Sequence, residues 1–253
     1  KLLRGEIDML QNDLPKELIT YLKQEENIKI TTGPGSNFAY LGFNMEDDLV
    51  GQFKLRKAIA HALNRDEIIK YVFGEAARPA SALLPPYHWA GNKDLALLQH
   101  NPELARKLVQ ELGGDGENPI NIVYKTSSDP FRLRLATIMQ QQLAEVGIQV
   151  ELRSYDWGTF YGDIKAGRFQ MYSLSWVGIK SPDIFEYVFH SKSVPPAGAN
   201  RGRFNNARVD RLIEQVGSTS KIKRRAGLYQ ELQAELLNTI PYVPLWYEEH
   251  FVA

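Results

Sequence analysis

In the middle of the chain, segments whose apolar residues have the spacing of a strand alternate with segments whose apolar residues have the spacing of a helix. This pattern predicts strands at residues 119–124, 148–153 and 169–176, with helices between them at 131–146 and 156–166. A strand–helix–strand–helix–strand order predicts parallel strands joined by right-handed crossover connections. We therefore expect an α/β fold in which helices flank a mainly parallel sheet.

Similar patterns predict further elements on both sides of this centre. Two further helices are marked by their ends: one starts at a capping box of Asn64 and Glu67 and stops at Gly74, and one starts at Asn101 and stops at Gly113. Helices are also expected over residues 1–10, 15–26, 54–63, 207–216 and 221–238. Strands are expected over 29–32, 38–45 and 241–249, with a turn between the first two at the Gly-Pro-Gly of residues 32–37. The Pro-rich residues 77–92 are expected to form an irregular covering loop.

The stretch MYSLSWVGIKSPDIFEYVF, residues 171–189, joins a strand pattern to a helix start. Its strand half ends at Trp176, and its second half carries Ser-Pro-Asp at residues 181–183. A proline at the first helical position loses no hydrogen bond, and Ser181 is expected to cap the free amides. A loop that contains glycine and begins with a large indole therefore connects the strand to the helix.

Three loops leave the carboxyl ends of the predicted parallel strands, at residues 125–131, 154–157 and 175–183. In open sheets of this type, ligands bind in the crevice outside those ends. All three loops contain aromatic residues or small polar residues. The sequence therefore predicts a binding crevice at this edge of the sheet.

Composition narrows the class of protein. The chain has 253 residues, of which 43% are hydrophobic, enough for a large core, and its 30 Lys and Arg balance 30 Asp and Glu. A net charge of zero argues against nucleic acid as a partner. The absence of cysteine excludes disulfides, thiolate metal sites and a cysteine nucleophile, and it fits an oxidising compartment such as a periplasm. No apolar run is long enough to span a membrane, and no signal peptide is present. Because the sequence starts at Lys1 without a methionine, it is interpreted as a piece of a longer protein.

Catalytic and cofactor signatures are missing from the sequence. It contains no metalloprotease, nucleophile-elbow, Walker or dinucleotide motif, and its five histidines are scattered. Residues 218–221 match S-x-x-K, but without the companion motifs of that enzyme class. We therefore expect neither an enzyme nor a bound cofactor or metal.

Trp157 and Trp176 are the main candidates for ligand contact. Both fall at carboxyl ends of neighbouring predicted strands, where an indole ring offers apolar area and its N–H can serve a polar ligand. The alternative is that either ring belongs to the core. The polar candidates in the same region are Ser127, Ser128, Ser173, Ser175, Arg132 and Arg134. The serines are candidates for hydrogen bonds to a ligand or for helix caps, and the arginines for an anionic ligand group or for a solvated helix face.

Several segments, in order, carry a resemblance that covers essentially the whole chain. They are LLRGEIDML, AYLGFNMED, LRKAIAHALNRDEIIKYVFGEAARPASALLP, ARKLVQELG, LAEVGIQVELRSYDWGTFYGDIKAGRFQM, SWVGIKSPD and FNNARVDRLIEQ. Together they resemble the family 5 extracellular solute-binding proteins, the peptide/nickel-type receptors of ABC importers.

This resemblance implies a periplasmic-binding-protein type II-like lobe. Family members have two lobes that close on a ligand; they lie in the periplasm or are lipid-anchored on the outer face of the cell membrane, and they deliver cargo to a membrane permease. Residues 1–45 are then the end of the first lobe and a hinge strand, residues 46–240 the second, carboxyl-terminal lobe, and residues 241–253 a return strand. Strands at 38–45 and 242–248 are expected to cross the hinge, and the parent protein is expected to be monomeric.

The resemblance also assigns positions at the cleft. Trp176 matches the cleft tryptophan of peptide receptors, Ser173 and Ser175 match pocket positions beside it, and Trp157 matches a second pocket aromatic. Phe131 matches the position of a histidine near the peptide carboxylate in oligopeptide receptors. Val177 and Gly178, next to Trp176, are expected to face the cleft together with the loop at residues 125–131.

One position departs from the peptide receptors. They carry an aspartate three residues after the cleft tryptophan, where it pairs with the α-amino group of the peptide, and this chain has Ile179 there. An ammonium group without a carboxylate is costly in a desolvated cleft, so Asp183 is the remaining candidate partner for an amine. The open alternatives for the cargo are a free, modified or branched peptide, a glycoside, an opine-like solute and a metal chelate. A ligand-sensing domain of a transcription regulator is the alternative function.

Overall fold

The computed structural model describes residues 1–11 and 16–253. The α-helices are α1 (Lys16–Leu22), α2 (Phe53–Ala62), α3 (Arg65–Ile68), α4 (Pro102–Gln110), α5 (Pro130–Ala144), α6 (Trp157–Ala166), α7 (Ile184–Phe189), α8 (Ala207–Ser218) and α9 (Ile222–Thr239). The strands are β1 (Thr31–Phe43), β2 (Ala77–Pro79), β3 (Ile120–Ser127), β4 (Ile148–Tyr155), β5 (Met171–Trp176) and β6 (Tyr242–Val252). Short helical turns cover Leu2–Arg4, Ile69–Phe73 and Gly74–Ala76.

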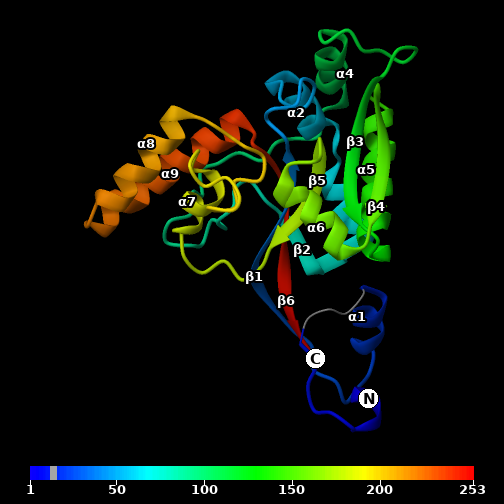
Figure 1. Ribbon diagram of the computed structural model, residues 1–253. Coiled ribbons are helices and arrows are strands. Elements are labelled where there is room, and N and C mark those ends of the chain that lie inside the picture. The colour runs from blue at the N-terminus through cyan, green and yellow to red at the C-terminus, as the bar shows by residue number, and fades with distance from the viewer. Residues whose placement is uncertain (12–15) are drawn as a thin grey trace.

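The strands form one sheet in the order β2-β6-β1-β5-β3-β4 (Figure 1). β3 is parallel to both β4 and β5, which confirms the predicted β-α-β-α-β unit. β1 pairs antiparallel with β5 and β6, and β2 pairs antiparallel with β6. The α/β class is confirmed, but the sheet is mixed rather than mainly parallel, because β1, β2 and β6 join it without the crossover helices that make strands parallel.

Helices cover both faces of the sheet and define two apolar cores. The core under α2, α4 and α5 includes Leu41 and Leu135, and the core under α6 to α9 includes Tyr40, Phe160 and Leu232. Successive residues of β1 point to opposite faces, so this strand contributes to both cores. Among the described residues, no helix has the length and apolar character needed to cross a lipid bilayer.

β1 is one continuous strand where two shorter strands and a turn were expected. The prediction of strands at residues 29–32 and 38–45 with a turn at 32–37 is wrong, since residues 31–43 form a single strand. β1 advances four residues from Gly33 to Asn37 while β6 advances two, from His250 to Glu248. The Gly-Pro-Gly segment is therefore accommodated as a bulge against β6, and long-range pairing overrides the local turn signal.

The N-terminal helix expected over residues 1–10 is absent. A single 3-10 turn, Leu2–Arg4, ends at Gly5, whose φ of 68° is left-handed. A helix of this length is marginal unless it packs against other structure, and no residue of this turn is buried. The helix expected over residues 15–26 is present as α1, although Pro15 lies outside the described residues.

The capping box predicted at Asn64 is half formed. Asn64 Oδ1 accepts a hydrogen bond from the Glu67 amide at 3.1 Å, as predicted. The Asn64 amide, however, donates to Gln142 Oε1 of α5 at 3.0 Å, so Glu67 does not complete the box. Asn64 thus starts α3 and also ties it to α5. Gly74, with a φ of 62°, ends the helical turn at Ile69–Phe73 as expected, and a short 3-10 turn, Gly74–Ala76, follows it.

The helix start predicted at residues 181–183 lies slightly further along the chain. α7 begins at Ile184, and its N-cap Asp183 makes no side-chain capping bond. Ser181 Oγ accepts a hydrogen bond of 3.3 Å from the Asp183 amide, as a capping residue does, while its hydroxyl donates to Asp183 Oδ2 at 2.7 Å. It caps the turn before α7 and not α7 itself. Ser181 and Pro182 instead form a turn that leads into α7.

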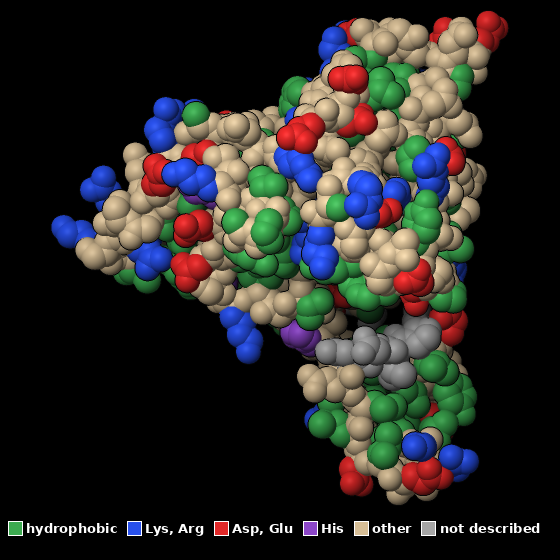
Figure 2. Space-filling view, viewed as in Figure 1, with side chains coloured by type: hydrophobic (Ala, Val, Ile, Leu, Met, Phe, Trp, Pro, Cys, Tyr) green, Lys and Arg blue, Asp and Glu red, His purple; other side chains and the backbone are tan. Residues whose placement is uncertain are grey.

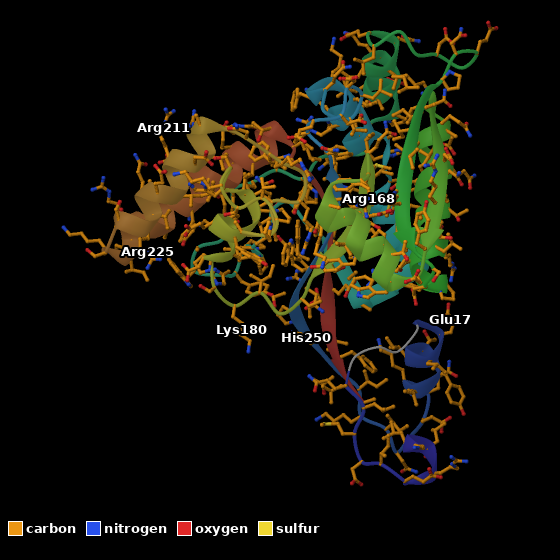
Figure 3. All side chains as sticks on the ribbon, viewed as in Figure 1. Glu17, Arg168, Lys180, Arg211, Arg225 and His250 are labelled. Atoms are coloured by element: carbon orange, nitrogen blue, oxygen red, sulfur yellow. The ribbon has the colours of Figure 1, made fainter. Side chains whose placement is uncertain are left out.

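β1 and β6 are the longest strands, and they reach beyond the body of the molecule (Figure 1). Their far ends lie beside the N-terminal segment that carries α1. There Gln11 forms a bridge with Val252, and Leu10 exchanges two backbone hydrogen bonds with Ala253. In the space-filling view the surface is notched where the strands leave the body, beside His250 (Figures 2 and 3).

Candidate functional site

The carboxyl ends of β3, β4 and β5 meet at one edge of the sheet, as the parallel order predicts. Trp157 begins α6 directly after β4 and is 58% exposed. Val177 follows β5 and is 74% exposed. Lys180, in the same loop, points away from the body (Figure 3). This edge therefore presents apolar side chains to solvent, as a binding surface requires.

Trp176 is half-buried at the end of β5. Its ring stacks on Tyr40 with centroids 6.5 Å apart and meets Tyr187 edge-on at 6.4 Å. The guanidinium of Arg201 lies 4.8 Å from the ring centroid. The indole is thus held in one orientation by neighbours from three other parts of the chain.

Trp157 is linked to Trp176 through two residues that the sequence analysis did not single out. Trp157 stacks on Tyr161, one helical turn along α6, with centroids 5.3 Å apart and planes 8° apart. The Tyr161 hydroxyl accepts a hydrogen bond of 3.1 Å from Arg201 Nη2, and Arg201 lies over Trp176. We call Trp157, Tyr161 and Trp176 the aromatic wall. The helical spacing of four residues was the available signal for Tyr161, whereas nothing local to the loop marked Arg201.

Arg201 is a buried cation, with 7% of its surface exposed. Arg201 Nη1 donates to the hydroxyl of Tyr40 at 3.1 Å. Burial on its own would lower the pKa of Arg201, but the hydroxyls of Tyr40, Tyr242 and Tyr172 raise that pKa above its ordinary value. The guanidinium is therefore charged at neutral pH. Burial likewise raises the pKa of Tyr40, Tyr172 and Tyr242, so these hydroxyls are neutral.

The predicted serines lie on the other side of β5 from Trp176. Ser173 Oγ accepts a hydrogen bond of 2.7 Å from Tyr124, whose pKa burial raises to about 12. Ser175 Oγ is buried and has no hydrogen-bond partner within the described part of the chain. Because side chains alternate along a strand, neither hydroxyl belongs to the aromatic wall. Ser127 is 9% exposed at the end of β3, and the exposed Ser128 donates its amide to the Tyr155 carbonyl.

Phe131 and Arg132 form a separate group at the start of α5. Phe131 is 39% exposed and meets Phe73 edge-on at 5.5 Å. Arg132 Nη1 lies 3.8 Å from Glu248 Oε1 of β6. Both residues are therefore beside the strand that leaves the body. Arg134 is exposed on the helix surface.

A cavity of about 290 Å³ lies near this second group, between α1 and β6. Its lining includes Ile19, Thr32, Phe73 and Glu249. Glu249 Oε1 is held by Arg78 at 2.6 Å. The cavity thus opens where the body meets the N-terminal segment, and not at the aromatic wall.

The loop after β5 places Ile179 and Asp183 in different surroundings. Ile179 is 6% exposed and packs into the core under α6 to α9. Gly178, with a φ of 63°, donates its amide to Asn37 Oδ1 of β1 at 2.9 Å. Asp183 is exposed and lies 3.7 Å from Arg225 of α9. The carboxylate of Asp183 is therefore paired with a helix arginine, and the position of Ile179 faces the core.

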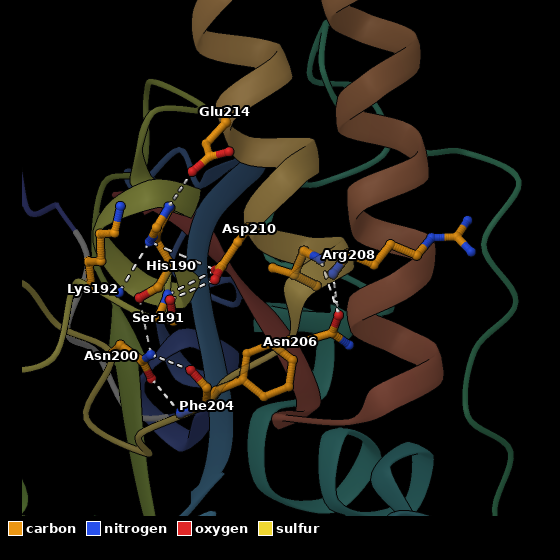
Figure 4. Close-up of polar contacts among 10 residues, drawn as sticks. His190, Ser191, Lys192, Asn200, Phe204, Asn206, Arg208, Asp210 and Glu214 are labelled. Atoms are coloured by element: carbon orange, nitrogen blue, oxygen red, sulfur yellow. Dashed lines mark hydrogen bonds and ion pairs between the residues drawn. The ribbon is translucent and has the colours of Figure 1, made fainter.

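His190, Ser191 and Asp210 lie close together and are residue types found in a catalytic triad (Figure 4). The Ser191 hydroxyl donates to Asp210 at 2.6 Å, while His190 Nδ1 accepts a hydrogen bond from the Lys192 amide at 3.1 Å. His190 is therefore not placed to take a proton from Ser191, as a nucleophile would require. The carboxylate of Asp210 instead fixes the loop after α7 through the hydroxyl and amide of Ser191. Within residues 1–11 and 16–253, no cluster of His, Asp and Glu is arranged to hold a metal ion.

Known proteins share both the sequence pattern and the fold of this chain. The dipeptide-binding protein of Escherichia coli (strain K12) is 28% identical over 245 residues, which are 95% of this chain and 46% of that protein. Heme-binding protein A of Haemophilus influenzae is 27% identical over 88% of this chain and 42% of its own length. The chain therefore spans about half the length of the curated relatives it matches.

Solved structures match over nearly the whole chain. The periplasmic binding protein DppA of Helicobacter pylori, in complex with the peptide STSA, has a TM-score of 0.86 and 24% identity. NikZ of Campylobacter jejuni, in complex with Ni(L-His), has a TM-score of 0.84 and 22% identity. Each match covers 99% of this chain and 49% and 52%, respectively, of the other protein. These matches confirm the predicted type II periplasmic-binding-protein fold.

A family model described as bacterial extracellular solute-binding proteins, family 5 Middle, matches residues 1–195. This match takes in the parallel unit, the aromatic wall and the loop after β5. It includes 195 of the 253 residues, so the chain belongs to family 5 of the bacterial extracellular solute-binding proteins.

Proposed function

We propose that this chain is part of the substrate-binding component of an ABC importer. The complete protein captures a peptide or a peptide-like small solute in a cleft between two lobes and delivers it to a membrane permease. Membership of family 5 is the observation that carries this proposal. The aromatic wall, whose Trp157 is exposed, supports it, because a receptor needs apolar contact area and not a nucleophile with its base.

The division of the chain into lobes is part of the proposal. Residues 46–240 form the second lobe, residues 1–45 contain the end of the first lobe with a hinge strand, and residues 241–253 return towards that lobe. The pairing of β1 with β6 beyond the body supports this division (Figure 1). On this reading the rest of the first lobe lies opposite the carboxyl edge of the sheet and closes over it.

The proposed function also implies where the complete protein works and with which partner. It works in the periplasm, or lipid-anchored on the outer face of the cell membrane, as a monomer whose partner is a permease. The zero net charge supports a function without nucleic acid. The proposed site residues at the sheet edge are Trp157, Trp176, Val177 and Gly178. The further candidates, which the structure places in separate surroundings, are Ser127, Ser173, Ser175, Phe131, Arg132 and Asp183.

Members of this family are named for different ligands, so family membership alone does not identify the cargo of this protein. One is named for dipeptides and another for heme, and one structural match holds Ni(L-His). The paired carboxylate of Asp183 weakens its candidacy as the partner of an amine. A modified peptide, a glycoside, an opine-like solute or a metal chelate therefore stands beside a free peptide as cargo.

Native mass spectrometry of the complete protein, purified gently from its own host, tests the function. We expect a bound small molecule in the wild type and its loss in Trp176→Ala, with the circular dichroism spectrum unchanged. Trp89→Ala is the matched control, because Trp89 packs on Tyr229 of α9 and not on the aromatic wall. A protein that never carries a small molecule would contradict the receptor function, and full retention of cargo in Trp176→Ala would contradict the site.

A further inference from the structure

β1 and β6 leave the six-stranded sheet as a pair. β1 pairs with β5 only as far as Phe38, and β2 pairs with β6 only as far as Glu248. Of the strands that the described residues form, only β1 and β6 continue beyond these points, and we call residues 31–33 with residues 250–252 the ribbon. A two-stranded ribbon is marginally stable by itself, so its course depends on the contacts at its base.

Gly35 lies in the bulge of β1 at the base of the ribbon, and its backbone groups bond to three side chains. Its amide donates to Glu249 Oε2 at 2.8 Å. Its carbonyl accepts hydrogen bonds from Arg78 Nη2 at 3.1 Å and from the Tyr87 hydroxyl at 2.9 Å. Gly35 is buried, and a buried backbone group without a partner is costly. Side chains from β2, from β6 and from the loop after β2 therefore stabilise the bulge.

Arg78 of β2 is the centre of this group. Arg78 Nη1 donates to Glu249 Oε1 at 2.6 Å, so the guanidinium and the carboxylate bind each other while both bond to Gly35. The guanidinium also lies 4.7 Å from the ring centroid of Tyr247 and 5.3 Å from that of Tyr87. Charge-assisted hydrogen bonds are stronger than neutral ones, and partial burial of this pair limits screening by salt. We call Arg78, Tyr87 and Glu249 the bulge clamp.

The loop after β5 is anchored next to the bulge clamp. Gly178 of this loop donates its amide to Asn37 Oδ1 at 2.9 Å. Asn37 is the first residue of β1 on the body side of the bulge, where it pairs with Glu248. The exposed Val177 precedes Gly178 in the chain. The proposed site and the base of the ribbon are thus both held at one short segment of β1.

We propose that the bulge clamp sets the direction in which the ribbon leaves the body, and that it thereby positions the first lobe over the sheet edge. Arg78 is the main positioning residue. A bulge bends and twists its strand, so the contacts that fix the bulge also fix the course of the strand beyond it. The proposal rests on the proposed function, because the first lobe is the part to which the ribbon leads. With a weakened clamp the first lobe samples more orientations, and fewer molecules are competent to bind.

Distances between two spin labels test the proposal on the complete protein, dialysed free of bound small molecules. Glu17→Cys in α1 carries one label beyond the ribbon, and Arg211→Cys in α8 carries the other on the body; both native side chains are exposed (Figure 3). This chain has no cysteine, and any cysteine elsewhere in the complete protein is replaced by serine. We expect double electron–electron resonance to give a broader distance distribution when Arg78→Met is added. Cargo eluted from the wild type should bind Arg78→Met about tenfold more weakly, the factor for a competent population reduced to about a tenth.

Two further variants separate the clamp from a general loss of an ion pair. Tyr87→Phe removes one hydroxyl and keeps the ring, so it should broaden the distribution less, and it decides the test if Arg78→Met does not fold. Lys54→Met is the matched control, because Lys54 pairs with Glu111 at 2.9 Å away from the ribbon. An unchanged distribution in Arg78→Met and Tyr87→Phe, equal broadening in Lys54→Met, or unchanged cargo affinity in Arg78→Met would overturn the proposal. The label distances do not depend on cargo, and native mass spectrometry tests the receptor function separately.

Discussion

Ile179 is the residue at which the sequence departs from the peptide receptors it resembles, and in the structure this residue is part of the apolar core. The side chain is 6% exposed and belongs to the core under α6 to α9. Its neighbours Val177 and Lys180 are exposed. Isoleucine at this position therefore stabilises the loop after β5, while the flanking residues remain at the surface.

We predict that Ile179→Asp destabilises the chain by about 3 kcal/mol at neutral pH, because it buries a carboxylate without a partner. Burial raises the pKa of that carboxyl on folding, so the folded state binds its proton more tightly. The loss of stability should therefore be smallest below about pH 4 and should grow as the pH rises. Urea unfolding of the variant and the wild type at two pH values measures the difference.

Ile179→Val is the matched control, since it removes one methylene and keeps the site apolar. It should cost about 1 kcal/mol at both pH values. Equal stability of Ile179→Asp and the wild type at neutral pH would mean that the loop turns this position outward.

Individual capping residues were readable from the sequence. Asn64 and Asn101 begin their helices by the side-chain bonds that the pattern predicts. Arg201, by contrast, was invisible because its partners lie far away in the chain. Tyr40 is 161 residues from it and Tyr161 is 40 residues from it. A cap depends on neighbours within one turn, whereas this cation depends on the packing of three separate segments.

Among the elements, β1 shows most clearly how long-range pairing overrides a local signal. Gly-Pro-Gly is a strong turn signal, yet β6 lies alongside this segment as well as the strand beyond it. A β-carbon on Gly35 would collide with the backbone carbonyl oxygen of Glu248. Glycine is needed there for close approach between strands and not for a turn.

We predict that Gly35→Ala destabilises the chain by about 2 kcal/mol, because the β1–β6 pairing must shift to admit the methyl group. Gly33→Ala is the control in the same strand, since a β-carbon at Gly33 has no atom within 4 Å. Chemical denaturation of the two variants measures the difference. Equal midpoints would show that the bulge adapts freely.

The parallel unit was the most predictable set of elements. β3, β4, β5 and the helices between them appear in the expected order, with boundaries that differ by a few residues. Their period and punctuation are local properties. The antiparallel neighbours β1 and β6 come from distant parts of the chain, so their direction and position in the sheet were not readable locally.

At the scale of the whole molecule, the chain carries one wall of the proposed cleft. Trp157 of the aromatic wall and Val177 of the loop after β5 are exposed, and the chain spans about half the length of its curated relatives. A ligand in a two-lobed receptor is buried by contacts from both sides. On the proposed function, this chain supplies only one side of those contacts.

We predict that the 253-residue chain binds the cargo eluted from the complete protein at least about tenfold more weakly than the complete protein does. Isothermal titration calorimetry on both proteins with the same eluted cargo measures this ratio. Equal affinities would locate the whole site within this chain and would contradict the inter-lobe cleft.

The sequence by itself determined the α/β class, the parallel unit and the family, because these follow from local periodicity and from a pattern spread along the whole chain. The tertiary structure alone decided the mixed sheet, the separation of Ser173 and Ser175 from Trp176, and the burial of Arg201 against Tyr40, Tyr161 and Trp176. The physical reason is distance along the chain. Strand direction, the face a side chain shares and the pairing of a buried charge depend on residues that meet only when the chain is folded.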